Sequence, residues 1–293
     1  MSFIVNLVNG ISLGSVYAII AIGYTMVYGI AKMLNFAHGD VIMIGGYITF
    51  VFMTDMGINP ILATFLAAIC CTIIGVIVEN IAYRPLRGAN SLSVLITAIG
   101  VSYFLQNIAL LTFGPNTKSF RSVVPISAMK FFDDKLIISG ESIVTIVVCI
   151  IIMILLTLFI NRTKLGVAML AVSEDRGASI LMGINVNKTI ALTFAIGSFL
   201  AGIAGVLLCS AYPTLTPTTG AMPGIKAFVA AVIGGIGSIS GAFFGGILLG
   251  VLEILSRAYI SSQLSDAIVF SLLIIMLSFK PQGLLGKMNI EKV

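Results

Sequence analysis

The few ionisable residues inside the apolar parts of this chain are the first candidates for chemistry. Glu79 lies near the end of one apolar stretch, five residues before Arg84, and Glu253 stands four residues before Arg257. Acidic residues within a membrane often mark a proton or ion relay. A four-residue spacing is also that of an ordinary helical ion pair. We therefore interpret both acids as structural partners and keep ion coupling as the alternative.

A second polar feature, His38 with Asp40, separates the first two apolar segments. We expect a satisfied pair at a helix end, with gradient-driven transport as the alternative. One histidine is too few for a usual zinc site. The four cysteines lie in apolar stretches without metal-ligand spacing. The sequence therefore predicts no metal site, no catalytic residue and no cofactor.

A phosphate-binding loop is also missing from the sequence. The pattern GxxxxGK[ST] does not occur, and GLLGK at 283–287 has the wrong spacing. No Ser-His-Asp set and no pair of catalytic carboxylates is visible. The chain is therefore predicted not to be an enzyme. If it moves a solute, the energy comes from an ion gradient or from a partner protein.

The elements that must position these residues are strongly apolar. Hydrophobic residues make up 59% of the 293 residues and charged residues only 9%, whereas soluble domains carry roughly a quarter charged residues. The net charge of +5 is not gathered into a basic cluster with interleaved aromatic residues, so no nucleic-acid partner is expected. This composition predicts an all-α, polytopic membrane protein.

The apolar segments predict eight to ten transmembrane helices in a single membrane domain over residues 1–293. A straight helix needs about 20 residues to cross the hydrocarbon core of a bilayer. The second and seventh segments are shorter and rich in glycine, so we expect them to be tilted, broken or re-entrant. The segments lie at 5–31, 40–56, 60–82, 91–113, 142–160, 188–211, 225–238, 240–260 and 265–280.

The distribution of lysine and arginine predicts the orientation of the chain in a cell membrane. Most basic residues fall in the linkers 83–90 and 161–188, at Lys32, and in the tail that holds Lys280, Lys287 and Lys292. The longest opposing loop, 114–141, carries fewer, among them Lys135. We therefore expect these linkers and the C-terminus to be cytoplasmic and the N-terminus to lie outside.

Glycines recur every four residues near the end of the chain. Gly237, Gly241 and Gly245 form one series, and Gly246 and Gly250 repeat the spacing. On a helix, this spacing places small residues on one face, where another helix can approach closely. We predict a packing face here and not a substrate site.

The linker 161–188 predicts a short amphipathic helix at about 174–182. A serine at 173 is a suitable N-cap, and two acidic residues follow in the first turn, where the helix dipole favours negative charge. Three apolar residues at spacings of three and four form a narrow face, and a glycine supplies the stop. So short a helix is unstable alone in water and needs the membrane interface or a protein partner. The candidate residues are Ser173, Glu174, Asp175, Arg176, Ala178, Leu181, Met182 and Gly183.

Several strings, in the same order along nearly the whole chain, resemble a known family. They are LNFAHGDVIMIGGY at 34–47, YRPLR at 83–87, TAIGVSYFLQN at 97–107, LMGINVNKTIALTFAIGSFLAGIAG at 181–205, IKAFVAAVIGGIGSISGAFFGGILLGVLE at 225–253 and KPQGLLG at 280–286. On these motifs the chain resembles LivH-type permease subunits of branched-chain amino-acid ABC importers.

The resemblance implies a type II importer fold and several partners. These are a homologous second permease, two cytoplasmic ABC ATPases, an extracytoplasmic amino-acid-binding protein and the surrounding membrane lipid. It implies leucine, isoleucine or valine as the cargo and makes the helix at about 174–182 the ATPase-coupling helix. Urea, short amides or other amino acids stay open as cargo because related permeases share these motifs. A gradient-driven secondary transporter is the alternative of another class.

Four polar residues inside apolar segments are candidates for lining the transport pathway: Asn35, Thr97, Gln106 and Asn107. Hydrogen bonding between helices is an equally open interpretation of each, because such groups commonly pair across membrane interfaces.

Overall fold

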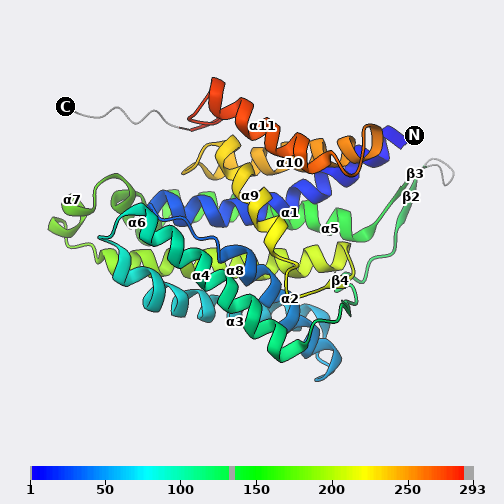
Figure 1. Ribbon diagram of the computed structural model, residues 1–293, viewed down its shortest axis with the longest axis horizontal. Helices are drawn as coiled ribbons and strands as arrows, with labels where there is room; N and C mark the ends of the chain where they lie inside the picture. Colours follow the sequence, from blue (N-terminus) through cyan, green and yellow to red (C-terminus); the bar gives the residue numbers. More distant parts are fainter. Residues whose placement is uncertain (1, 132–135, 287–293) are drawn as a thin grey trace.

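The computed structural model describes residues 2–131 and 136–286. Lys135, Lys287 and Lys292, which enter the orientation argument, lie outside these ranges. The molecule is an elongated stack of helices whose long members run along one axis (Figure 1). Helix α7 (Arg176–Leu181) lies at one end, and the hairpin of β2 (Met129–Phe131) and β3 (Leu136–Ile138) lies at the other. We refer to them as the α7 end and the hairpin end.

Each predicted apolar segment falls on a helix of the structure. These helices are α1 (Ser2–Ala31), α2 (His38–Thr54), α3 (Pro60–Val78), α4 (Ser91–Phe113), α5 (Gly140–Arg162), α8 (Val186–Ala211), α9 (Ala221–Gly234), α10 (Ile239–Tyr259) and α11 (Ser265–Phe279). The remaining elements are the π-helical turn η1 (Glu79–Tyr83), the 3-10 turn η2 (Arg84–Leu86), α6 (Lys164–Glu174), β1 (Lys118–Ser119) and β4 (Thr214–Leu215). Both strand pairs, β1 with β4 and β2 with β3, are antiparallel.

Six of the described helices are long and apolar enough to cross a membrane: α1, α3 with its continuation to Leu86, α4, α5, α8 and α10. Helices α2, α9 and α11 are apolar but shorter. The prediction of a multi-pass, mostly helical membrane protein is confirmed. The predicted number of eight to ten membrane helices is not decided by these lengths.

Polar side chains fix the starts of five long helices, α3, α4, α5, α8 and α10. An oxygen of each N-cap residue accepts a hydrogen bond from a backbone N–H of the first turn, which would otherwise lack a partner. Asn90 accepts from Ser93 at the start of α4, and Ser139 accepts from Ser142 at the start of α5. Such caps turn an apolar run into a helix with a defined beginning.

Glycines bring α1 and α10 into backbone contact, as the four-residue spacing predicts. A Cβ added at Gly14 would lie 2.7 Å from the Cα of Ile247, and one added at Gly246 would lie 2.5 Å from the Cα of Ala18. No side chain fits between the two helices at these points. Gly237 is an exception to the predicted series, since it lies before α10 in a turn with φ of +96°.

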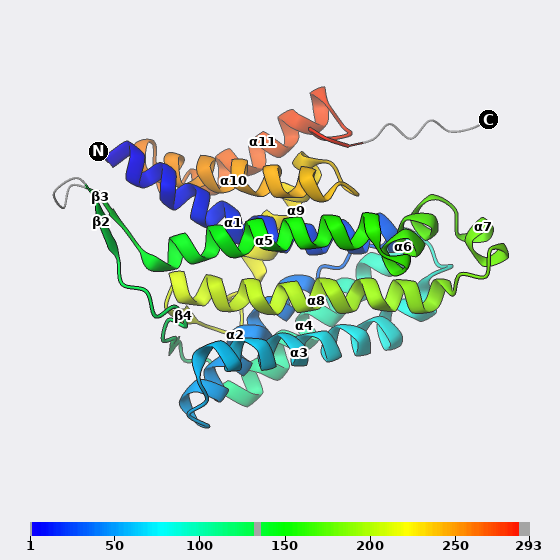
Figure 2. The ribbon, with the colours of Figure 1, turned by 180° about the vertical axis from the view of Figure 1, so that it is seen from behind.

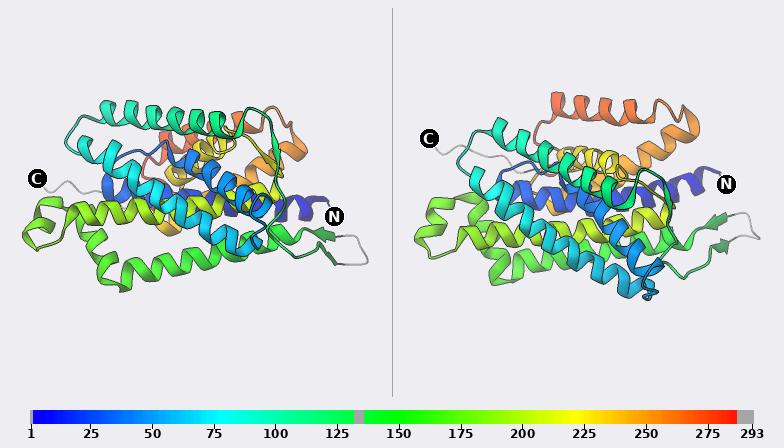
Figure 3. Two further views of the ribbon diagram at one scale, coloured as in Figure 1. Left: turned by 90° about the horizontal axis from the view of Figure 1, so that it is seen from below. Right: turned by 60° about the horizontal axis from the view of Figure 1, so that its bottom comes forward.

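The helices differ in how much of their surface the rest of the chain covers. Of the most apolar window of α8, 67% is buried, against 22% for α4 and for α5. In Figure 2, α5 and α8 run beside each other from the hairpin end to the α7 end. Figure 3 shows α4, in teal, along the outer edge of the molecule and away from α5, in green. The exposed faces of α4 and α5 are therefore left for lipid or for a partner protein.

Candidate functional site

Two short helices begin inside the molecule and meet there. Helix α1 runs unbroken to Ala31, and the chain then turns back, so that His38 at the start of α2 packs on Gly23. Gly23 lies eight residues before the end of α1, or about 12 Å at 1.5 Å per residue. At the start of α9, a Cβ added at Gly224 would lie 2.8 Å from the Cα of Gly39. The N-termini of α2 and α9 therefore cross in the interior.

Such a crossing has a definite electrostatic character. The first turn of each helix carries partial positive charge, and preceding residues accept from several of its backbone N–H groups, those of His38, Asp40 and Ala221 among them. In membrane transporters, broken helices of this kind place their N-termini near the carboxylate or phosphate of a substrate. The aromatic rings of Tyr24 and His38 lie over the crossing with centroids 4.7 Å apart.

Polar residues around this crossing bond to other elements. Asp40 accepts a 2.8 Å hydrogen bond from the Nε2 of Gln106 on α4, and the Tyr83 hydroxyl donates to Asn35 over 2.9 Å. The Nε2 of buried His38 has no hydrogen-bond partner among the described residues. The expected pairing of His38 with Asp40 is wrong: both lie in the first turn of α2, and Asp40 takes its partner from α4 instead.

The four candidate pathway residues do not form one cluster. Asn35 is buried in the segment before α2. The other three lie on α4, where Thr97 and Gln106 are half-buried and Asn107 is exposed and bonds only to the carbonyl of Tyr103 one turn earlier. Thr97 precedes Gln106 by nine residues, roughly 14 Å along the helix. Of the four, Gln106 is the residue that hydrogen-bonds to a buried acidic side chain, that of Asp40.

A buried charge cluster joins four helices near the hairpin end. Lys226 on α9 lies 2.7 Å from Glu253 on α10 and 2.7 Å from Asp266 on α11. Glu253 also pairs with Arg257 and accepts a 2.9 Å hydrogen bond from Tyr17 on α1. The Glu253–Arg257 pair was predicted. Lys226 was missed, although a single lysine in an apolar segment is a signal that a buried partner exists.

The second predicted acid has a different partner from the expected one. Fully buried Glu79 pairs with Arg87, and Arg87 also donates to Asn187 at the start of α8. Arg84, the expected partner, donates to Asn80 instead. This set ties the end of α3 to α8 at the α7 end of the molecule.

The linker between α5 and α8 forms two short helices and not the single one predicted. Ser173 is not an N-cap: it lies inside α6, and its hydroxyl donates to the carbonyl of Leu170. Asp175 has the extended backbone of a cap and accepts from the backbone N–H of Ala178, so that α7 begins at Arg176. Gly183, with φ of +81°, follows the helix as predicted.

Helix α7 projects from the bundle with its apolar side chains uncovered. Leu181 is 89% exposed and Met182 is 82% exposed. Arg176 holds the helix to the bundle by donating to the carbonyl of Ala31 at the end of α1. Partial burial, and after it the positive charge of Arg87, lower the pKa of Arg176. The candidate coupling residues thus fall on two elements: Ser173 and Glu174 end α6, and the others form the turn of α7, where Arg176 is half-buried and the rest are exposed.

Within residues 2–131 and 136–286, no group of three or more histidine, cysteine, aspartate or glutamate side chains could hold a metal ion. Apolar spanning helices, interior helix starts and buried ion pairs define a multi-pass membrane protein of the permease class. A model of the family described as branched-chain amino acid transport system / permease component matches residues 6–277. The chain belongs to this family.

Individual relatives are similar over almost their full length. The high-affinity branched-chain amino acid transport system permease protein BraD of Pseudomonas aeruginosa is 47% identical over 99% of this chain and 98% of that protein. The corresponding LivH of Escherichia coli K12 is 44% identical over the same shares of both chains. A probable LivH of Methanocaldococcus jannaschii is 29% identical over 92% of this chain and 88% of its own. These relatives are transport permeases and not enzymes.

One solved structure, PsaBC from Streptococcus pneumoniae in complex with Fab, aligns with 94% of this chain and 91% of that chain. Its TM-score is 0.49 at 14% identity, which is too low to support an argument.

Proposed function

We propose that this chain is a transmembrane permease subunit of an ABC importer that moves leucine, isoleucine or valine into the cell. The observation that carries the proposal is the 44–47% identity, over nearly the whole chain, to relatives named as branched-chain amino acid transport permeases. Separate ATPase subunits supply the energy, since the sequence has no phosphate-binding loop of its own.

Helix α7 is the proposed contact with the ATPases. Its apolar turn, Ile180 to Met182, is exposed to solvent with no covering element among the described residues. A turn of six residues cannot hold its own shape in water, so its Asp175 cap and the Arg176 contact with α1 preorganise it for a partner. An ATPase groove would bury this surface.

The interior crossing of α2 and α9 is the proposed centre of the pathway. Two helix N-termini there favour the carboxylate of an amino acid. Gln106 and Asn107 lie on one turn of α4, whose outer face the chain leaves open, and Thr97 and Asn35 lie nearer the α7 end. We infer that these four residues line the route when α4 faces a second, homologous permease.

The same proposal fixes the topology. Helices α2, α9 and α11 join the six long helices, giving nine membrane helices in a type II importer fold, with the whole chain as one permease domain. The α7 end faces the cytoplasm and the hairpin end faces outward, toward an extracytoplasmic binding protein. The basic residues Lys32, Arg87 and Arg176 at the α7 end support this orientation.

Labelled leucine uptake in cells lacking this chain, with and without its re-expression, tests the proposal. We expect restored, ATP-dependent uptake that excess isoleucine and valine inhibit and excess urea does not. Correct insertion with copurifying ATPases but no leucine uptake would reject this cargo in favour of urea, amides or other amino acids. Uptake that persists without ATPases would instead favour a gradient-driven transporter.

A further inference from the structure

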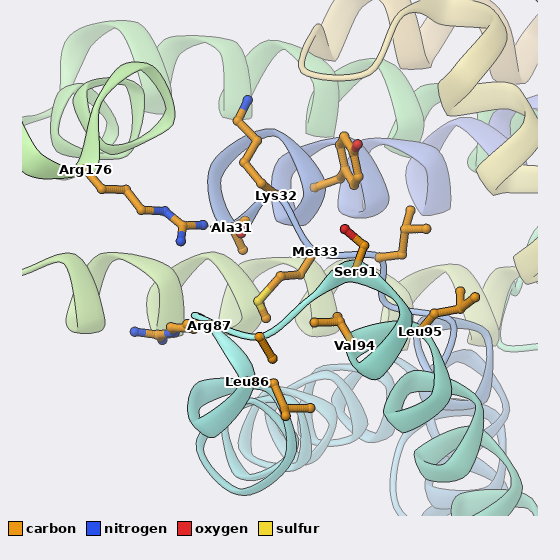
Figure 4. Close-up of a pocket in the computed structure, with 12 residues that line it drawn as sticks. Ala31, Lys32, Met33, Leu86, Arg87, Ser91, Val94, Leu95 and Arg176 are labelled. Atoms are coloured by element: carbon orange, nitrogen blue, oxygen red, sulfur yellow. Dashed lines mark hydrogen bonds between the residues drawn. The ribbon is translucent and has the colours of Figure 1, made fainter.

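A pocket of about 330 Å3 opens at the α7 end of the molecule (Figure 4). It lies between the last turn of α1, the turn from η2 into α4, and α7. Three cationic residues, Lys32, Arg87 and Arg176, are among its lining, and the described residues that line it include no acidic one. The transport role proposed above does not use this pocket.

Of the two guanidinium groups in the pocket, only that of Arg87 pairs with a carboxylate among the described residues. Arg176 donates a hydrogen bond to an uncharged acceptor, the carbonyl of Ala31, and in Figure 4 its guanidinium points toward this residue. Arg87 is already engaged: it pairs with Glu79 and donates to Asn187, and its remaining Nε is buried. A guanidinium carries five N–H donors. Arg176 therefore keeps donors for an anionic ligand, and Arg87 adds positive charge beside it.

A third positive feature lies at the other side of the pocket. Ser91, at the first position of the 23-residue helix α4, contributes to the lining. The N-terminus of a helix carries partial positive charge and presents backbone N–H groups, an arrangement that recurs where proteins bind phosphate. The helix end adds to the arginines but would not define a site without them.

The rest of the lining is apolar. Met33, Leu86, Val94 and Leu95 belong to this part, together with neighbouring residues and the ring of Tyr28. The first turns of α4 continue outward with Leu92 and Ile96, each 62% exposed. The cationic residues of the pocket therefore lie next to an exposed apolar helix face. This arrangement suits a lipid, whose phosphate head group would contact the cations and whose acyl chain would lie on the apolar face, as in basic pockets between membrane helices.

We propose that this pocket binds a phosphate group to Arg176 and the first turn of α4, beside the positive charges of Arg87 and Lys32, carried by an anionic membrane lipid or by a free phosphate ion. Because Arg176 belongs to α7, an occupied pocket also fixes α7 against α1. On the orientation proposed above, the lipid would come from the cytoplasmic leaflet. The binding itself can be tested without any transport measurement.

Native mass spectrometry of the full chain, purified in detergent with any copurifying subunits, measures this binding. Phosphatidylglycerol and phosphatidylcholine with identical acyl chains are added in equal amounts. We expect preferential retention of phosphatidylglycerol, reduced roughly tenfold in the double variant Lys32→Gln, Arg176→Gln, because charge-assisted hydrogen bonds are lost. Lys164→Gln, an exposed lysine at the same end that does not line the pocket, should bind as the wild type does.

Two further measurements identify the source of the phosphate and distinguish a loss of binding from a loss of folding. Millimolar inorganic phosphate that displaces the lipid indicates a site for the phosphate group alone, and failure to displace it indicates a lipid site. Arg176→Lys keeps the charge and should retain most binding, which a folding defect would not predict. Equal retention of the two lipids by the wild type, or unchanged retention in the double variant, would overturn the proposal.

Discussion

Lys226 and Glu253 lie 27 positions apart in the chain, yet their charged groups approach to 2.7 Å in the interior of the bundle. Both side chains are buried, with 4% of Lys226 and none of Glu253 exposed. Lys226 also reaches Asp266, so that one ammonium links α9, α10 and α11. A buried ion pair adds little net stability, but breaking it leaves an isolated charge at high cost.

Lys226→Met should therefore destabilise the protein, by less than the roughly 3–5 kcal/mol of a fully unpaired buried charge, because Arg257 still pairs with Glu253. Cys71, Cys149 and Cys209 are buried and free, so a thiol-reactive fluorogenic dye reports thermal unfolding in detergent. The melting temperature should fall in Lys226→Met and recover in part when Glu253→Gln is added, because a buried carboxylate left with Arg257 as its cationic partner is then removed. An unchanged melting temperature in the single variant would show that Lys226 and Glu253 are not coupled.

The contact between α1 and α10 predicts a difference between two glycines. Gly14→Ala places a methyl group 2.7 Å from the Cα of Ile247, where only backbone can move, and should cost about 1–3 kcal/mol. Gly100 on α4 has no atom within 4 Å of an added Cβ, so Gly100→Ala is the matched control. It should be neutral or stabilising by up to about 1 kcal/mol through helix propensity. The same thermal assay compares them, and equal melting temperatures would refute the close contact.

How much the sequence reveals depends on whether the signal is local. Apolar runs predict the helices because each run alone must satisfy its backbone inside lipid. The glycine face of α10 is visible in the same way, since its spacing lies within one helix. The crossing of α2 and α9 is not visible, because Gly39 and Gly224 meet only after the chain has folded.

Pairing errors have physical causes of the same kind. Arg84 was expected to meet Glu79, but η1 is a π-helical turn, which changes the angular phase of the residues that follow. The 3-10 turn η2 follows, and Arg87, directly after it, is the residue that contacts the buried carboxylate of Glu79. At the linker, Ser173 and Asp175 are both good caps by residue type. The packing of Met169 and Val172 keeps α6 helical through Glu174 and leaves the cap to Asp175.

Gln106→Leu tests the contact between α4 and the interior crossing. The substitution keeps the side-chain size but removes the 2.8 Å hydrogen bond to Asp40, which is 2% exposed. Leaving a buried acceptor without a donor costs about 1–3 kcal/mol. Under the proposed pathway, leucine uptake should fall roughly tenfold or more while ATPase copurification is unchanged. Thr112→Val, which loses only a bond to its own helix, should transport normally, and normal uptake by Gln106→Leu would remove this residue from the pathway.

The double variant Leu181→Ser, Met182→Ser tests the role of α7. These side chains are the most exposed apolar residues of the linker, so replacing them leaves the fold of the bundle intact. If a partner ATPase buries them, each loss weakens the contact by about 1.5–3 kcal/mol, and together they lower the affinity at least a hundredfold. Copurification of the ATPases and leucine uptake should both be lost, with insertion and melting temperature preserved. Ile126→Ser removes a 41% exposed apolar side chain from the opposite end and should keep the ATPases bound. If the α7 variant also kept them, the contact would have to lie elsewhere on the permease.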